Sequence, residues 1–168
     1  MDKRYLLIII IIIVCCANLS IIVNNSDDVG SASVSIGKYL FSTPKDFSLS
    51  ENNGNSAIIE NEKNNMNIYV ETNLSDSDNY NRRLNYIENG TNDTILSKGT
   101  VSIANLTVNT VYYKSTDNNN HSAFYFEKDN TPFKIVVSNF NYNNDRDKTL
   151  DYITFIIKSI TYDYKTSK

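Results

Sequence analysis

The chain has two cysteines, one histidine and five glycines, and each scarcity excludes a class of chemistry. Cys15 and Cys16 lie near the N-terminus, so nothing after them can form a disulfide, a thiol nucleophile or a cysteine-bound metal site. His121 has no second histidine or nearby cysteine in the sequence, which excludes a conventional zinc site. The five glycines form no glycine-rich phosphate-binding loop.

The charge balance excludes a further class of partner. The chain carries 16 Lys and Arg against 19 Asp and Glu, for a formal net charge of −3, and the two signs are well mixed along it. Proteins that bind nucleic acid concentrate basic residues into a stripe or patch that contacts phosphates, and the sequence has no such stripe. We therefore predict that nucleic acid is not a partner.

The N-terminus carries the one long apolar segment of the chain. Lys3 and Arg4 are followed by an uninterrupted apolar run from Tyr5 to Val14, and a further apolar stretch ends at Val23. A basic start followed by such a run is typical of an export signal or a membrane anchor. We therefore expect the rest of the chain to function outside the cytoplasm.

This segment fits both an anchor and a cleaved signal. Residues 5–23 are almost long enough to span a membrane, since a helix needs roughly 17–25 residues to do so. The uninterrupted run over 5–14 has the length of a signal-peptide core, and residues 15–17 are small enough for a signal peptidase. We favour a retained anchor with its N-terminus in the cytoplasm, because basic residues precede the run and acidic residues follow it.

The domain organisation follows from this leader. Residues 1–23 are predicted to be a signal peptide or transmembrane anchor, and residues 24–32 a polar linker. Residues 33–168 are predicted to form a single extracytoplasmic domain, a length that suits one hydrophobic core.

Hydrophobic alternation predicts strands, and apolar residues at helical spacing predict two helices. The first helix is expected from 76 to 88, with Ser75 and Asp78 as a capping box and Gly90 just past its end. The second is expected to begin near Asn144 and to carry an apolar stripe of Leu150, Ile153, Ile157 and Ile160. Strands are expected at 33–40, 56–60, 66–71, 94–97, 99–104, 106–114, 123–127 and 133–137.

The order of these elements predicts the fold class. Strands, a helix, several further strands and a last helix indicate an α+β fold, in which an antiparallel β-sheet is covered by two helices. We therefore predict an αβα sandwich, preceded by the N-terminal hydrophobic helix.

Three short segments of this domain resemble PsbP-like domains. Residues 41–49 (Phe-Ser-Thr-Pro-Lys-Asp-Phe-Ser-Leu) resemble the entry segment of that fold, residues 66–70 its second hairpin strand, and residues 155–160 its closing helix. The resemblance extends over residues 36–162 in element order. Members of this fold group include the extrinsic subunit of photosystem II and a Ran-binding import factor. The resemblance implies a binding or assembly-support module without a common active site, and no functional residue is carried over from it.

The residues that could carry catalysis or bind a metal have structural explanations. We interpret His121 as a solvated histidine at a loop tip, where neighbouring Ser122 and Asp117 do not create the geometry of a catalytic triad. Residues 76–79 and 141–147 supply oxygen ligands at alternating positions, as calcium loops do, but lack the glycine and distal Glu of an EF-hand. We interpret both as helix N-caps and predict no catalytic residue, metal or cofactor.

Tyrosine and asparagine are abundant. Tyr is common at binding interfaces, but contacts within a sheet or between helix and sheet are its more frequent location. We therefore interpret six tyrosines as packing residues: Tyr69, Tyr80, Tyr86, Tyr112, Tyr113 and Tyr125. Asparagines followed by x-Ser/Thr are candidate glycosylation sites, although their number is close to what the composition yields by chance. Those in the domain are Asn73, Asn89, Asn92, Asn105 and Asn120.

These observations predict a non-catalytic extracytoplasmic binding or assembly module held at the cell envelope. The N-terminal segment would bring it to the membrane, and its partner would be a protein or a glycan. An accessory subunit of a membrane complex is one alternative, which the PsbP-like resemblance favours. An exported hydrolase that uses Asp and Glu is another, and a deep pocket with two carboxylates of raised pKa would support it.

Overall fold

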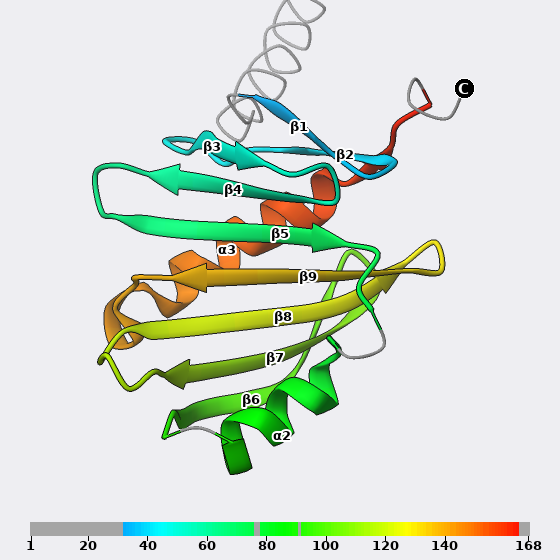
Figure 1. Ribbon diagram of the computed structural model, residues 1–168. Helices are drawn as coiled ribbons and strands as arrows, with labels where there is room; N and C mark the ends of the chain where they lie inside the picture. The colour runs from blue at the N-terminus through cyan, green and yellow to red at the C-terminus, as the bar shows by residue number, and fades with distance from the viewer. Residues whose placement is uncertain (1–31, 76–77, 91, 165–168) are drawn as a thin grey trace, which may run out of the picture.

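A seven-stranded antiparallel sheet is the centre of the computed structural model, which describes residues 32–75, 78–90 and 92–164 (Figure 1). Its strands lie in the order β3-β4-β5-β9-β8-β7-β6, and a smaller sheet has the order β1-β2-β10. The large sheet consists of β3 (Ser48–Asn52), β4 (Ser56–Asn61), β5 (Met66–Thr72), β6 (Thr94–Ile103), β7 (Leu106–Lys114), β8 (Asn120–Lys128) and β9 (Thr131–Ser138). The other elements are β1 (Ser33–Ile36), β2 (Tyr39–Ser42), β10 (Thr161–Tyr162), α2 (Tyr80–Gly90) and α3 (Tyr142–Ser159).

Helix α3 closes one face of the large sheet. Side chains alternate between the two faces of a strand, so every second residue of the central strands points toward α3. In β5, for example, Ile68 and Val70 are completely buried on this side, whereas Tyr69 between them is half-buried on the other. The side chains that α3 contributes to this core include Ile153, Ile156 and Ile157.

The start of α3 is set by an asparagine cap. The Asn141 side chain accepts hydrogen bonds from the backbone N–H groups of Asn143 (3.1 Å) and Asn144 (3.3 Å). These groups have no partner within the helix, so the cap stabilises a sequence whose β-branched residues alone favour a strand. The predicted start near Asn144 is therefore two residues late, because the cap is Asn141 and the helix begins at Tyr142.

The smaller sheet packs into the same core. The Tyr39 ring lies edge-on against Phe133 (centroids 5.0 Å apart), and its hydroxyl donates a hydrogen bond to Thr131 Oγ1 (2.9 Å). The single strand predicted over 33–40 is wrong: Gly37, with a φ of 54°, allows a tight turn that divides this segment into β1 and β2.

Helix α2 lies against the opposite face of the large sheet (Figure 1). Its buried Ile87 and half-buried Leu84 pack against Val111 and Tyr113 of β7 and Ala123 of β8. The residues of β4 and β5 that point to this side are only half-buried, so α2 covers the β6–β8 part of the face and leaves the β3–β5 part open. This half-open face forms the candidate functional site.

Three further differences from the predicted elements have local causes. Strand β3 is absent from the prediction because its five residues are all exposed and mostly polar, and it is held by backbone pairing with β4. The two strands predicted at 94–97 and 99–104 are one strand, β6, with an irregular register between Ile95 and Ser97. Helix α2 begins at Tyr80 because the side chain of Asn79 accepts a hydrogen bond from the Arg82 backbone N–H, so Ser75 is not its cap.

The predicted α+β class, with antiparallel sheets and two helices, is confirmed. The predicted N-terminal hydrophobic helix lies outside the described residues. Within those residues, no helix has the length and apolar character needed to cross a membrane.

Candidate functional site

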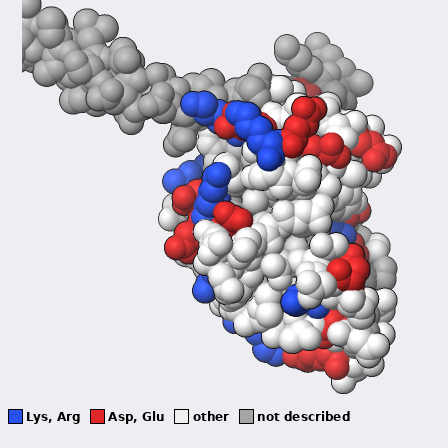
Figure 2. Space-filling view, turned by 90° about the vertical axis from the view of Figure 1, so that its left-hand side faces the viewer, with Lys and Arg blue, Asp and Glu red and all other residues white. Residues whose placement is uncertain are grey.

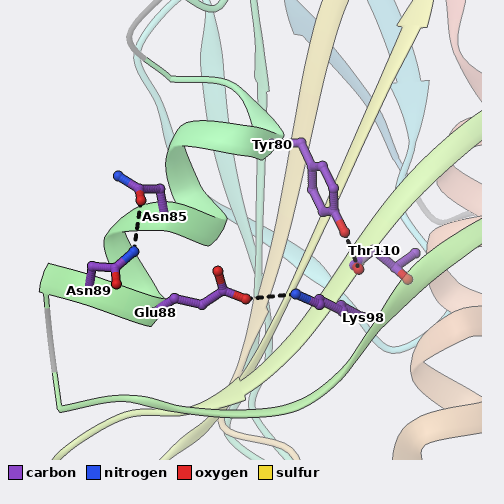
Figure 3. A network of polar contacts seen from close by, with 6 residues as sticks. All are labelled: Tyr80, Asn85, Glu88, Asn89, Lys98 and Thr110. Carbon is purple, nitrogen blue, oxygen red and sulfur yellow. Dashed lines mark hydrogen bonds and ion pairs between the residues drawn. The ribbon is translucent and has the colours of Figure 1, made fainter.

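Helix α2 is fixed to the sheet near both of its ends (Figure 3). At its start, the Tyr80 hydroxyl donates a hydrogen bond to the Thr110 backbone oxygen (3.4 Å). Near its end, Glu88 forms an ion pair with Lys98 of β6 (2.6 Å). An exposed ion pair of this kind contributes little to stability, so the apolar contacts under α2 supply most of its attachment. The helix is thereby held in one position above the sheet.

A pocket of about 630 Å³ lies where α2 begins. Its floor is formed by residues of β7, β8 and β9, and its wall by the chain that leads into α2. The volume falls within the roughly 300–1,000 Å³ usual for small-molecule sites. Side chains that line it include Asp78, Tyr80, Asn81, Asn109, Tyr125 and Glu127.

Tyr125 is the most buried polar side chain of this pocket. It is 5% exposed, and its ring lies edge-on to that of Tyr80, with centroids 5.9 Å apart. Burial, followed by the charge of Asp78, raises the pKa of its hydroxyl. No residue in the described part of the chain forms a hydrogen bond with that hydroxyl. This oxygen is not among the fully buried, unpaired side-chain atoms of the described residues, so it reaches the pocket and is available to a ligand.

A cluster of three charges borders the pocket. Lys134 Nζ lies 2.7 Å from Glu71 Oε2 and also contacts Asp78 Oδ2 directly. The Lys134 side chain is only 13% exposed, and its ammonium lies 5.5 Å from the centre of the Tyr69 ring. Burial would lower the pKa of Lys134, but the hydrogen bonds to Asp78 and Glu71 outweigh it and raise that pKa. Lys134 therefore remains charged and ties β5 and β9 to the chain before α2.

His121 lies in β8 rather than at a loop tip, which corrects the prediction. Its ring stacks on that of Tyr113, with centroids 5.2 Å apart. Nδ1 lies 2.9 Å from Ser138 Oγ, and Nε2 lies 3.1 Å from Ser115 Oγ, which itself donates to Asp117 Oδ1. Pairing of β8 with β7 and β9 explains the error, because it brings His121 to Ser115 and Ser138, which are 6 and 17 residues away in the sequence.

This arrangement places Asp117 in a chain of hydrogen bonds with His121, through a serine that sequence reasoning missed. Ser115 donates to Asp117, so it accepts from His121 Nε2–H, and Nδ1 accepts from the Ser138 hydroxyl. Ser122 points to the other face of the sheet, where it is fully buried. The predicted lack of a triad between His121, Ser122 and Asp117 agrees with this geometry.

We expect the stability of the protein to fall between pH 7 and pH 5 because of His121. Burial, with a further contribution from the charge of Arg83, lowers the pKa of this histidine, against the opposing effect of Asp117 and Asp93. The unfolded chain then takes up a proton below about pH 6.5 that the folded chain binds less readily, so protonation favours unfolding.

Urea unfolding at a series of pH values checks this. The His121→Gln variant should lose less stability over the same interval, because its side chain cannot titrate. Equal losses in both proteins would contradict the assignment.

Within the described residues, no group of three or more His, Cys, Asp or Glu side chains is placed to hold a metal ion. Of the two segments compared with calcium loops, one contains the Asn141 cap of α3, as predicted. The other is described only at Asp78 and Asn79, since residues 76–77 lie outside the described ranges. There Asp78 pairs with Lys134, and Asn79 caps α2.

The five candidate glycosylation sites differ in accessibility. Asn73, Asn92 and Asn105 are exposed in connections between elements, and Asn89 is exposed near the end of α2, where it donates to Asn85 Oδ1 (Figure 3). Asn120 is half-buried, and its side-chain N–H group donates to the Phe140 backbone oxygen (3.0 Å). Glycosylation of the four exposed sites stays a prediction, and Asn120 is the least suited of the five.

Sequence reasoning identified none of these residues as a binding site. Tyr80 and Tyr125 are correctly predicted as contacts between helix and sheet, but they also line the pocket. No sequence pattern indicated a binding role for Lys134, Glu71 or Asn109, because strand alternation indicates only that their side chains face away from the main core. The charged residues on the side seen in Figure 2 are mixed in sign and separated by uncharged areas.

No protein-family model matches this chain, and no curated protein is significantly similar to it in sequence. Solved structures of similar fold include LpqN of Mycobacterium tuberculosis, involved in cell envelope biogenesis, with a TM-score of 0.50 and 8% identity over 79% of this chain and 90% of that one. A protein of Bacteroides thetaiotaomicron has a TM-score of 0.50 and 11% identity over 83% of this chain, which spans 51% of that protein's length.

A third structure is cyanobacterial PsbP (CyanoP) of Synechocystis sp. PCC 6803. It has a TM-score of 0.48 and 13% identity over 78% of this chain and 91% of that one. A PsbP structure is thus among the solved structures to which this chain is similar, in line with the resemblance noted in its sequence. No ligand, partner or activity follows from it, because folds of this kind are shared by proteins of different function.

Proposed function

We propose that this protein is a non-catalytic binding or assembly module held at the outer side of the cell membrane. The observation that carries the proposal is the half-open sheet face: α3 closes one side of the sheet, whereas α2 closes only part of the other and forms a pocket at its start. A rigid sheet that positions polar and aromatic side chains at a pocket is a common basis of ligand binding.

The location rests on the N-terminal segment. In this proposal, the basic start and the apolar run over residues 5–14 direct the chain to the membrane, with residues 1–23 as an export signal or a retained anchor. LpqN, whose fold is similar, takes part in cell envelope biogenesis, and this supports an extracytoplasmic location for the present domain.

An exported hydrolase is the weaker reading. Such an enzyme needs two carboxylates that can act as acid and base. At the border of the described pocket, Glu71 and Asp78 are both paired with Lys134, so neither is available for that role without first losing its ion pair. Binding requires no such rearrangement.

Membrane fractionation with in-cell cross-linking tests the proposed function. The full chain should sediment with membranes. It should also be degraded by protease added to cells whose outer layer has been made permeable. A variant lacking residues 2–23 should be soluble and protected inside the cell. Recovery of the full chain in the soluble cytoplasm would contradict the proposal. A single membrane complex captured reproducibly by cross-linking would make the protein an accessory subunit of it.

A further inference from the structure

We infer that the pocket at the start of α2 binds a neutral sugar, as a mono- or short oligosaccharide unit of an envelope glycan. This inference rests on the proposed function of an envelope binding module and names its ligand class. It is carried by the combination of aromatic, amide and hydroxyl groups that the fold places around one pocket.

The pocket matches the two chemically different surfaces of a sugar. A sugar ring presents C–H groups on its faces and hydroxyl groups around its edge. Tyr80 and Tyr125 supply apolar ring surface, while Asn81 and Asn109 supply amide groups that donate and accept hydrogen bonds. Neither asparagine side chain forms a hydrogen bond with another described residue, so both can serve a ligand.

The Tyr125 hydroxyl is a further group of the pocket with which a sugar can form a hydrogen bond. This side chain is 95% buried, and its hydroxyl lacks a hydrogen-bond partner in the described residues. The hydroxyl opens on the pocket, so a ligand hydroxyl that reaches it replaces a contact with water by a direct hydrogen bond. Because a sugar hydroxyl both donates and accepts, it can pair with Tyr125 and with either asparagine.

The charges around the pocket favour a neutral ligand over a charged one. Asp78 is paired with Lys134, whereas Glu127 stands at the pocket without an ion pair in the described part of the chain. An anionic ligand would be repelled by Glu127. A cation would be attracted, but an ammonium group has no acceptor for the amide N–H groups of Asn81 and Asn109.

Calorimetric titration of the purified full chain tests the inference, in a detergent without a sugar headgroup. The probes are three neutral trimers (maltotriose, cellotriose and chitotriose), a cationic glucosamine trimer and an anionic galacturonic acid trimer. At least one neutral trimer should bind, and more tightly than either charged trimer. Tyr125→Phe should weaken this binding about fivefold, the effect of one lost hydrogen bond, and Asn109→Ala should do so by a similar factor.

Matched controls separate the pocket from the rest of α2. Tyr86→Phe and Asn85→Ala change the same residue types outside this pocket and should leave binding unchanged. The urea unfolding midpoint of each variant shows that it is folded.

Three results would each overturn the inference: binding of only a charged trimer, equal binding by Tyr125→Phe and the parent, or no binding of any trimer. The fractionation result stands independently of these outcomes, so a failed ligand assignment is distinguishable from a failed proposed function.

Discussion

Replacing Phe133 by alanine should lower the free energy of unfolding by about 3–5 kcal/mol, the usual cost of removing a large buried aromatic side chain. Phe133 has no exposed surface. Its ring stacks on Phe126 (5.2 Å) and receives the edge of Tyr39 (5.0 Å). Since Tyr39 belongs to the small sheet and Phe133 to the large one, the substitution removes one of the contacts that join them.

The measurement is urea unfolding of the full chain followed by circular dichroism, because the protein has no tryptophan to report on the transition. Leu49→Ala is the matched control: Leu49 is 46% exposed on β3, and its substitution should change stability by no more than about 0.5 kcal/mol. The loss of unfolding free energy for Phe133→Leu should lie between the losses for Phe133→Ala and Leu49→Ala. A loss below about 1 kcal/mol for Phe133→Ala would mean that the two sheets do not share one core.

How much of the fold can be predicted depends on whether a segment carries its own pattern. Strand β5 alternates apolar and polar residues without interruption, and its extent is predicted closely from that alternation. Strand β3 has no such pattern, since its side chains are exposed and it is held mainly by backbone pairing with β4. A strand that forms because its neighbour pairs with it cannot be predicted from its own residues.

The candidate site is harder to predict than the strands, because its residues are brought together only by contacts between distant parts of the sequence. Lys134 and Asp78 are 56 residues apart in the sequence, and they meet because β9 pairs with β5 and the chain then turns toward α2. His121 is misplaced for a related reason: three asparagines before it indicate a loop, whereas pairing with Tyr113 and Ser138 makes it part of β8. Local composition predicts turns well, but it cannot detect contacts that the sheet creates.

Replacing Lys134 by alanine should lower the free energy of unfolding by about 3 kcal/mol, at the lower end of the 3–5 kcal/mol typical of breaking a buried ion pair. The substitution leaves Glu71 and Asp78 close together without their cation. The lower end applies because water reaches both carboxylates, whose side chains are 25% and 36% exposed. A combined Glu71→Gln, Asp78→Asn and Lys134→Met variant should stay within about 1 kcal/mol of the parent, since it removes all three charges together.

The pH dependence of these proteins separates the ion cluster from simple packing. Because the pKa of Lys134 is raised in the folded state, its contribution is complete below about pH 10.5 and is lost as the pH rises through the folded value.

The raised pKa of the Tyr125 hydroxyl also makes stability fall as the pH rises, since this hydroxyl ionises at a lower pH in the unfolded chain than in the folded one. The two effects therefore add in the parent, whereas the triple variant retains only the part of the tyrosine effect that burial causes, because the charges of Asp78 and Glu71 are gone.

Urea unfolding between pH 9 and pH 11 should accordingly show a steeper loss of stability in the parent than in the triple variant. Parallel curves would mean that Lys134 stabilises the fold through the packing of its aliphatic chain rather than through its charge.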